Sequence, residues 1–144
     1  MLGHKTFDEW VEIFEKKDDS TYELSPGERV VFDPMHGFFS YWFNPESLNI
    51  IIPKMCGDIK HWYPKITKLY FATKQLGTKG VLFCTKRNPY AFMRLVGGEL
   101  KSVEYTYDFE KKKAHTIWFI SITGENYNKE AAKRWAAAGH RSKQ

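Results

Sequence analysis

The chain has 144 residues, of which 42% are hydrophobic and 17% aromatic, and its formal net charge at pH 7 is +5. These values exclude a disordered chain and a small domain that needs disulfides or metals to hold its core. The charge favours acidic partners such as nucleotides, nucleic acid or phosphorylated cofactors, without choosing among them. We expect one domain over residues 1–144, with a C-terminal helix and basic tail over 128–144.

The cysteines and the apolar runs narrow the class of protein further. Cys56 and Cys84 are the two cysteines, and they lack a C-x-x-C or metal-like spacing. We therefore expect no disulfide framework and no metal site, and Cys84 is expected to pack inertly within a strand. No apolar run reaches the ~20 residues of a membrane span, and the first residues lack the apolar centre of a signal peptide. These absences predict a cytoplasmic protein that does not act at a membrane.

The N-terminal third is expected to form one helix and three strands. Thr6 to Glu9 matches a capping box, in which the two side chains satisfy each other's backbone N–H groups, so a helix is expected over about 7–17. Strand candidates follow at 29–32, 38–43 and 48–52. The third candidate has three consecutive isoleucines, which predicts a strand buried on both faces.

Residues 54–77 have apolar side chains at helical spacing, but Pro64 divides them. Either a helix begins near Asp58 and is kinked at Pro64, or Pro64 is its first residue and 53–63 form a long loop. The second alternative is favoured here. Gly77 is the expected end of the helix.

The C-terminal half gives the clearest local signals. An apolar run at 80–85 predicts a buried strand, and Asn88-Pro89 then opens a short helix over about 89–96 that ends before two glycines. Strands at 100–107 and 115–123, joined by a polar linker, predict a β-hairpin. Asn128 is expected to cap a last helix that ends at Gly139 and lies on the domain as an appendage.

The expected order is helix, strand, strand, strand, helix, strand, helix, strand, strand, helix. The strand-helix-strand unit in mid-chain should be parallel and the flanking hairpins antiparallel. This order predicts the α/β class, as an α+β mixed sheet: one central twisted sheet flanked by helices.

Over residues 29–123 this order resembles the GNAT-type N-acyltransferase superfamily. In that family a loop of the form Q/R-x-x-G-x-G/A follows the strand before the central helix and holds the pyrophosphate of acyl-CoA. The segment that begins at Lys54 stands at this place, with a basic first residue and the middle Gly57. It departs from the family pattern at Ile59, where a small residue is usual, and at Asp58, where an acid would face the anion.

The resemblance implies a cofactor site for acetyl-CoA or another acyl-CoA. It places Lys54, Gly57 and Asp58 near the pyrophosphate. It also places Ile51 and Ile52 where the strand would splay and offer a backbone N–H to the oxyanion of the reaction.

A second family feature is the segment N-x-x-A, followed by a helix and Gly, which lies beside the pantetheine arm. Asn88-Pro89-Tyr90-Ala91 matches its beginning, so the resemblance places Asn88 and Ala91 at the cofactor. The frequent tyrosine general acid of the family corresponds to Leu95, which cannot donate a proton. Tyr90 lies on a different helical face and is more simply a packing or surface residue.

No catalytic residue is assigned by the sequence. Candidate bases for deprotonating an amine are Glu46, Asp33, His36 and His61, all expected in loops or at element ends. None has a partner at a diagnostic spacing, so each is better explained as a surface group.

The resemblance implies an acyl-CoA-dependent N-acyltransferase whose acceptor is an amine-bearing small molecule or protein. The alternative is a fold relative without catalysis, which acts as a structural or interaction protein through a protein partner or self-association. The compact form is similar to that of short acyltransferase-like proteins encoded by tailed phages. A viral origin is therefore expected, with a place in the virion or against a host factor.

Binding of nucleic acid is the weaker hypothesis. Aromatic side chains that could stack on bases are interleaved with lysines, as single-strand binders require. The aromatic residues are Tyr41, Trp42, Trp62, Tyr63 and Tyr107, and the lysines are Lys54, Lys60, Lys65 and Lys68. However, no ribonucleoprotein-type strand signature is present, and aromatics in expected strands more often build a core.

Overall fold

A computed structural model describes the backbone of residues 4–142 and the side chains up to Ala138. Within this part the chain forms a seven-stranded mixed sheet and four helices. The helices are α1 (Phe7–Asp18), α2 (Ile59–Lys74), α3 (Pro89–Val96) and α4 (Lys129–Ser142). The strands are β1 (Arg29–Asp33), β2 (Gly37–Asn44), β3 (Asn49–Ile52), β4 (Met55–Gly57), β5 (Gly80–Thr85), β6 (Glu99–Asp108) and β7 (Lys113–Ile122).

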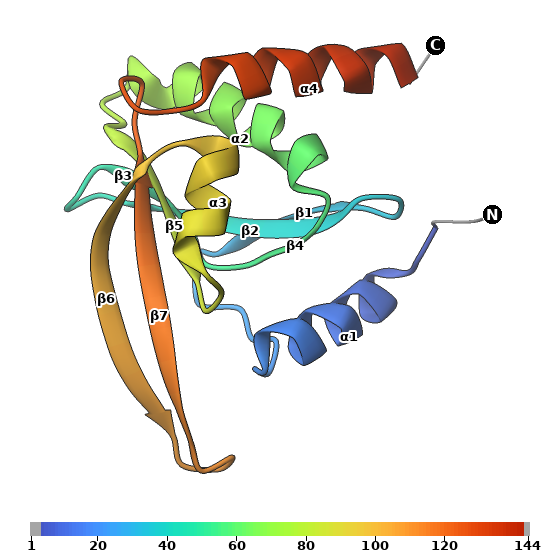
Figure 1. Ribbon diagram of the computed structural model, residues 1–144, viewed down its shortest axis with the longest axis vertical. Coiled ribbons are helices and arrows are strands. Elements are labelled where there is room, and N and C mark those ends of the chain that lie inside the picture. Colours follow the sequence, from blue (N-terminus) through green and yellow to red (C-terminus); the bar gives the residue numbers. More distant parts are fainter. Residues whose placement is uncertain (1–3, 143–144) are drawn as a thin grey trace.

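The strand order is β1-β2-β3-β5-β7-β6, and β4 pairs with β2 outside this path. Only β3 and β5 are parallel among the described strand pairs, and the segment that connects them contains β4 and α2. The expected parallel unit between antiparallel hairpins is therefore confirmed, as is the mixed sheet flanked by helices. Figure 1 shows the long β6–β7 hairpin extending away from the helices.

Two cores lie on opposite faces of the sheet. Phe38 and Phe39 are neighbours in β2, so their side chains point to opposite faces. Phe38 belongs to the smaller core, which α1 covers with Trp10 and Phe14. Phe39 belongs to the larger core, which α2 covers.

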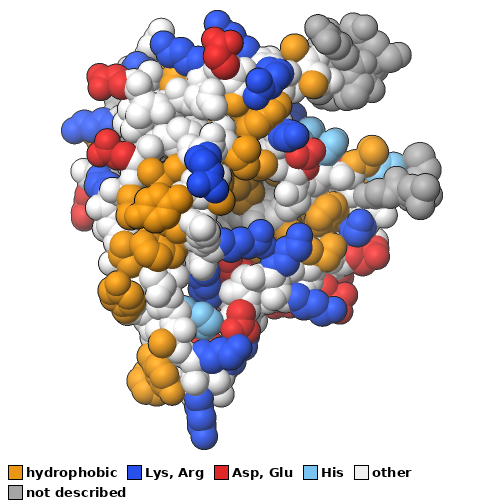
Figure 2. Space-filling model, in the orientation of Figure 1, with side chains coloured by type: hydrophobic (Ala, Val, Ile, Leu, Met, Phe, Trp, Pro, Cys, Tyr) orange, Lys and Arg blue, Asp and Glu red, His pale blue; other side chains and the backbone are white. Residues whose placement is uncertain are grey.

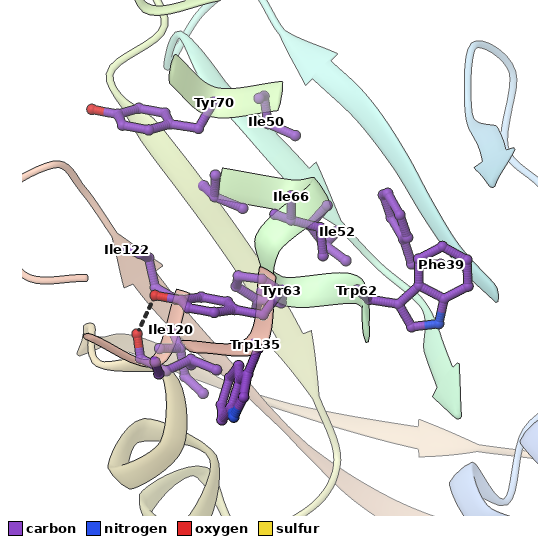
Figure 3. Close-up of a cluster of buried hydrophobic side chains, with 14 residues drawn as sticks. Phe39, Ile50, Ile52, Trp62, Tyr63, Ile66, Tyr70, Ile120, Ile122 and Trp135 are labelled. Atoms are coloured by element: carbon purple, nitrogen blue, oxygen red, sulfur yellow. Dashed lines mark hydrogen bonds between the residues drawn. The ribbon is translucent and has the colours of Figure 1, made fainter. Parts of the chain in front are cut away.

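Figure 3 shows the larger core, where side chains of α2 point toward the sheet strands. The hydroxyl of Tyr63 donates a hydrogen bond of 2.7 Å to the carbonyl oxygen of Val96, at the end of α3 (dashed in Figure 3). Tyr63 is fully buried, so this bond satisfies a hydroxyl that would otherwise be costly to desolvate. It also ties α2 to α3.

The favoured start of the central helix was wrong: α2 begins at Ile59, and Pro64 lies inside it. The side chain of Asp58 accepts a hydrogen bond from the backbone N–H of Lys60 and caps the helix. Trp62, in the turn before Pro64, is buried in the larger core. Packing of this turn outweighs the single backbone hydrogen bond that a proline removes.

The last helix is not an appendage. α4 packs against α2, as Figure 1 shows, and Ala131 and Trp135 are buried in the larger core. The expected cap is confirmed, because Oδ1 of Asn128 accepts from the backbone N–H of Ala131 at 3.1 Å. The helix continues through Gly139 instead of ending there. Residues 143 and 144 of the basic tail lie outside the described residues.

None of the helices in the described part of the chain is long and apolar enough to cross a membrane.

Candidate functional site

The sheet opens beyond the C-terminal end of β3, where the chain turns away from β5. β3 and β5 pair in parallel as far as Ile52 and Phe83. Beyond Ile52 the chain continues as β4, which pairs only with β2 among the described strands.

The opening coincides with a β-bulge. In β2, Trp42 pairs with Ile51 and Phe39 pairs with Met55. Between these pairs, two residues of β2 lie opposite three residues of the segment that joins β3 to β4, and the middle one of these three is Pro53. A bulge bends its strand and increases its twist, so β4 turns away from β5.

A groove of about 410 Å³ fills the angle between the separated strands. Its walls come from β3, β4, β5, α3 and the C-terminal turn of α1. In Figure 2 the surface is hollowed between α3 and α1, and Lys and Arg side chains stand along one rim. The lining residues are Phe14, Asp18, Ile52, Pro53, Met55, Cys56, Phe83, Cys84, Thr85, Arg87, Asn88, Ala91, Phe92 and Leu95.

The lining is mostly apolar, and its charged groups come from α1 and the β5–α3 connection. Asp18 is the one carboxylate among the described lining residues. It accepts a hydrogen bond of 3.0 Å from the Ser20 hydroxyl and lies 3.9 Å from Nζ of Lys86. Arg87 supplies a cation to the same groove. An apolar groove with a few polar groups is the usual form of a small-molecule site.

The two cysteines of the groove are not activated nucleophiles. Burial raises the pKa of the Cys56 thiol, and burial, with a smaller contribution from Glu104, raises the pKa of Cys84 to about 12. Both groups are therefore neutral thiols at pH 7, whereas nucleophilic catalysis requires the thiolate.

The structure brings together three of the expected cofactor residues. Ile52, Asn88 and Ala91 all line the groove. Ile52 ends β3, whereas Asn88 and Ala91 belong to the cap and the first turn of α3, far along the sequence. Ile51 is buried but does not line it, because neighbouring residues of a strand face opposite sides.

Lys54 lies outside the groove and is engaged elsewhere. Its Nζ donates a hydrogen bond of 2.7 Å to Glu28, whose side chain is only 1% exposed. Burial by itself would raise the pKa of Glu28, but Lys54, with smaller contributions from Ser40 and the backbone N–H of Ser25, outweighs it and holds this pKa below its usual value. The lysine stabilises a buried charge and is not directed at a ligand.

Gly57 and Asp58 also lie outside the groove, and each has a local structural role. Gly57 has φ of +104°, and a Cβ at this position would overlap the carbonyl oxygen of His36. Asp58 caps α2, so its carboxylate stands where an anion would meet the helix N-terminus. The segment expected to bind pyrophosphate is the strand β4 and a helix cap.

Three of the four candidate bases lie together, away from the groove. One ligand-type atom from each of Asp33, His36 and His61 lies within 4.8 Å of the others. Burial, with a smaller effect of His36, lowers the pKa of His61 and keeps its ring neutral at pH 7. Glu46 is in the β2–β3 connection and is not part of this cluster.

Sequence reasoning missed the contribution of α1. Phe14 and Asp18 line the groove because α1 packs beside β4. The amphipathic pattern of this helix predicts that it packs on something but not on which strand. Leu95, at the family's tyrosine position, lines the groove, whereas Tyr90 is exposed at the start of α3.

A comparison of the sequence with protein-family models gives no match, and a comparison with curated proteins gives none either. Functional inference for this chain therefore rests on the groove and on the residues around it.

Proposed function

We propose that the groove binds the acyl-pantetheine arm of acetyl-CoA or another acyl-CoA, and that the chain is an N-acyltransferase of acyltransferase-like fold acting on an amine. The observation that carries this proposal is the separation of the parallel strands β3 and β5 at a bulge, which opens a mostly apolar groove beside Asn88 and Ala91.

The groove suits a narrow chain that carries amide groups. The edge of β4 that faces away from β2 has no strand partner among the described residues. Unpaired backbone groups of a strand edge can hydrogen-bond the amides of pantetheine as they would another strand. Apolar side chains such as Met55 and Phe92 would contact the methylene segments and the acyl group.

Asp18 is the residue proposed to receive the acceptor. Its carboxylate would attract an ammonium group to the groove and accept a proton from it, leaving the amine free to attack the thioester carbonyl. A backbone N–H of the separated strand would stabilise the oxyanion. The CoA thiolate is a good leaving group at neutral pH, since thiols have a pKa near 8.5, so the reaction does not require a proton donor at Leu95.

The engaged Lys54 and the capping Asp58 predict weak recognition of the CoA pyrophosphate. Most of the binding free energy would then come from pantetheine. We expect acetyl-CoA and S-acetylpantetheine to bind with dissociation constants within about tenfold of each other, a free-energy difference of about 1.4 kcal/mol.

Isothermal titration with acetyl-CoA tests the proposal, using Ala91→Trp to fill the groove. Ala91 is an exposed helix residue at the groove wall, so a larger side chain should block the ligand without disturbing a core. Tyr90→Trp is the matched control, because Tyr90 is its exposed neighbour outside the lining. Saturable binding that is lost only in Ala91→Trp supports the proposal. No binding of acetyl-CoA to the unchanged protein contradicts it.

An exposed aromatic surface favours a second candidate, a structural or interaction protein without catalysis. Tyr105 and Phe109 are 81% and 82% exposed, and Tyr107 lies between them in sequence on the same hairpin. Figure 2 shows apolar side chains following this hairpin toward its tip. Contiguous exposed apolar surface commonly marks a protein contact, here with a host factor, a virion component or a second copy.

Sedimentation equilibrium separates the two candidates. A stable oligomer that dissociates in Tyr105→Ser/Phe109→Ser, together with no acetyl-CoA binding, would favour the interaction protein. A monomer that binds acetyl-CoA would favour the enzyme.

A further inference from the structure

A compact polar cluster lies at the corner where the β1–β2 turn meets the start of α2. Asp33 is the last residue of β1, His36 precedes β2, and His61 is in the first turn of α2. Nε2 of His61 lies 3.6 Å from Oδ2 of Asp33. This nitrogen is buried and has no hydrogen-bond partner. A buried polar atom without a partner destabilises the folded state, so buried polar atoms in proteins normally have one.

The backbone holds the two segments of this cluster together. The carbonyl oxygen of His36 accepts hydrogen bonds from the backbone N–H of Asp58 at 2.9 Å and from Nε1 of Trp62 at 3.1 Å. Gly37 and Gly57 face each other across β2 and β4, and a Cβ on either would overlap backbone of the opposite segment. The side chains therefore project from a corner whose backbone is fixed on both sides.

Neighbouring hydrogen-bonding groups orient the side chains. Oδ1 of Asp33 accepts from the backbone N–H of Met35 at 2.9 Å, which leaves Oδ2 directed at His61. Oδ2 of Asp58 lies 3.6 Å from Nδ1 of His36, which leaves Nε2 of His36 for another partner. A carboxylate on the far nitrogen of a histidine is a recurrent outer contact of metal-binding histidines.

We propose that Asp33, His36 and His61 bind one divalent transition-metal ion, with Zn²⁺ and Co²⁺ as suitable ions. Two imidazoles and one carboxylate are the ligand set that such ions prefer, whereas Ca²⁺ and Mg²⁺ prefer oxygen ligands alone. The remaining coordination positions open to solvent, because the side chains of His36 and Asp33 are about one-third exposed.

Binding requires a small rearrangement of the histidine rings. The rings of His36 and His61 are stacked, with centroids 3.7 Å apart and planes at 7°. Ligand lone pairs lie in the ring plane, so the rings must tilt before both nitrogens point at one ion. His36 has more room to turn, because its side chain is 32% exposed, whereas that of His61 is only 12% exposed and its ring packs against Trp62. Bonds of about 2.0–2.2 Å would then draw the ligand atoms closer together.

This site does not depend on the proposed acyl transfer, because none of its residues lines the groove. Titration of the full chain with Co²⁺ tests it, since tetrahedral Co²⁺ bound to protein ligands has visible absorption bands that the hydrated ion lacks. We expect bands that saturate at one equivalent and are displaced by Zn²⁺. Zn²⁺ should also raise the melting temperature of the unchanged protein.

The variants locate the ion. His61→Gln and Asp33→Asn should lose the saturable bands, and Asn at 33 keeps the side-chain oxygen that accepts from Met35. Asp58→Asn should weaken binding by about 10-fold or more while keeping all three ligands. His115→Ala is the matched control, because the Nε2 of His115 is also buried without a partner but belongs to no cluster of ligand groups among the described residues. It should bind Co²⁺ as the unchanged protein does.

Circular dichroism of each variant establishes that it is folded before titration. No saturable Co²⁺ bands with the unchanged protein would overturn the proposal. Bands that persist in folded His61→Gln and Asp33→Asn would also overturn it, since the ion would then lie elsewhere.

Discussion

The two ends of β4 differ in how closely neighbouring segments of the protein approach them. Near Met55 the strand is not paired with β5, and the groove lies between the two strands. At Gly57 the strand approaches the β1–β2 turn so closely that neither segment has room for a Cβ. A three-residue strand therefore separates an open apolar site from a closed polar corner. Residues expected in one cofactor site are therefore divided between two places.

The largest expected effect comes from adding a Cβ at the polar corner, where there is no room for one. Gly57→Ala should lower the free energy of unfolding by at least about 4 kcal/mol, because the added Cβ overlaps backbone and φ is positive. Urea denaturation measures it. Gly77→Ala is the control, since Gly77 also has positive φ but nothing within 4 Å of a Cβ, and it should cost about 1 kcal/mol. Equal losses in both variants would show that the close approach has no energetic consequence.

Removing the partner of the buried charge beside β4 should have the next largest effect. Lys54→Met leaves Glu28 buried and unpaired, and should destabilise the fold by about 3 kcal/mol. Glu28→Leu/Lys54→Met should recover most of this loss, because no charge then remains buried. An unchanged free energy of unfolding in Lys54→Met would instead indicate that Lys54 is free to bind a ligand, as recognition of pyrophosphate requires.

The same pair predicts a pH dependence. The pKa of Glu28 is lower in the folded chain than its usual 4.5, so folding favours the ionised form. This contribution is complete above about pH 4.5 and is lost as the pH falls through the folded pKa. The stability of the unchanged protein relative to Glu28→Leu/Lys54→Met should therefore decrease below about pH 4.5. Urea titrations at several pH values measure this difference, and a constant difference would contradict it.

At the open end of β4, Asp18→Asn separates binding from chemistry. If Asp18 accepts the proton of the amine, the rate of acyl transfer should fall by about 100-fold while acetyl-CoA affinity is unchanged. Single-turnover acylation of a reactive amine measures the rate, and calorimetry measures the affinity. Loss of affinity with an unchanged rate would instead assign Asp18 to cofactor binding.

The smallest effect on stability is expected at the hairpin. Tyr105→Ser should change the free energy of unfolding by less than about 0.5 kcal/mol, because this side chain is almost wholly exposed. Thermal unfolding measures it. A larger loss of stability that depends on protein concentration would reveal that the hairpin is buried in an oligomer.

Elements with complete local signals were predictable from the sequence. α3 spans the expected residues because Asn88 caps it, Pro89 favours its first turn and Gly97 ends it. β5 likewise matches the apolar run that predicted it. The start of α2 was predicted wrongly because two local signals compete, a proline suited to a first turn and an aspartate suited to a cap. Only burial of the turn between them decides which one acts.

Local patterns in the sequence predicted the class of the sheet and the order of the elements other than β4, and the family resemblance pointed to three residues that line the groove, Ile52, Asn88 and Ala91. The predicted elements follow from periodicity, caps and turns, which act over a few residues. Tertiary structure alone decided the bulge at Pro53, the strand β4, the place of Asp18 in the groove and the meeting of His36 with His61. Each depends on contacts between segments far apart in the chain, and their free energy is set by packing that no local pattern specifies.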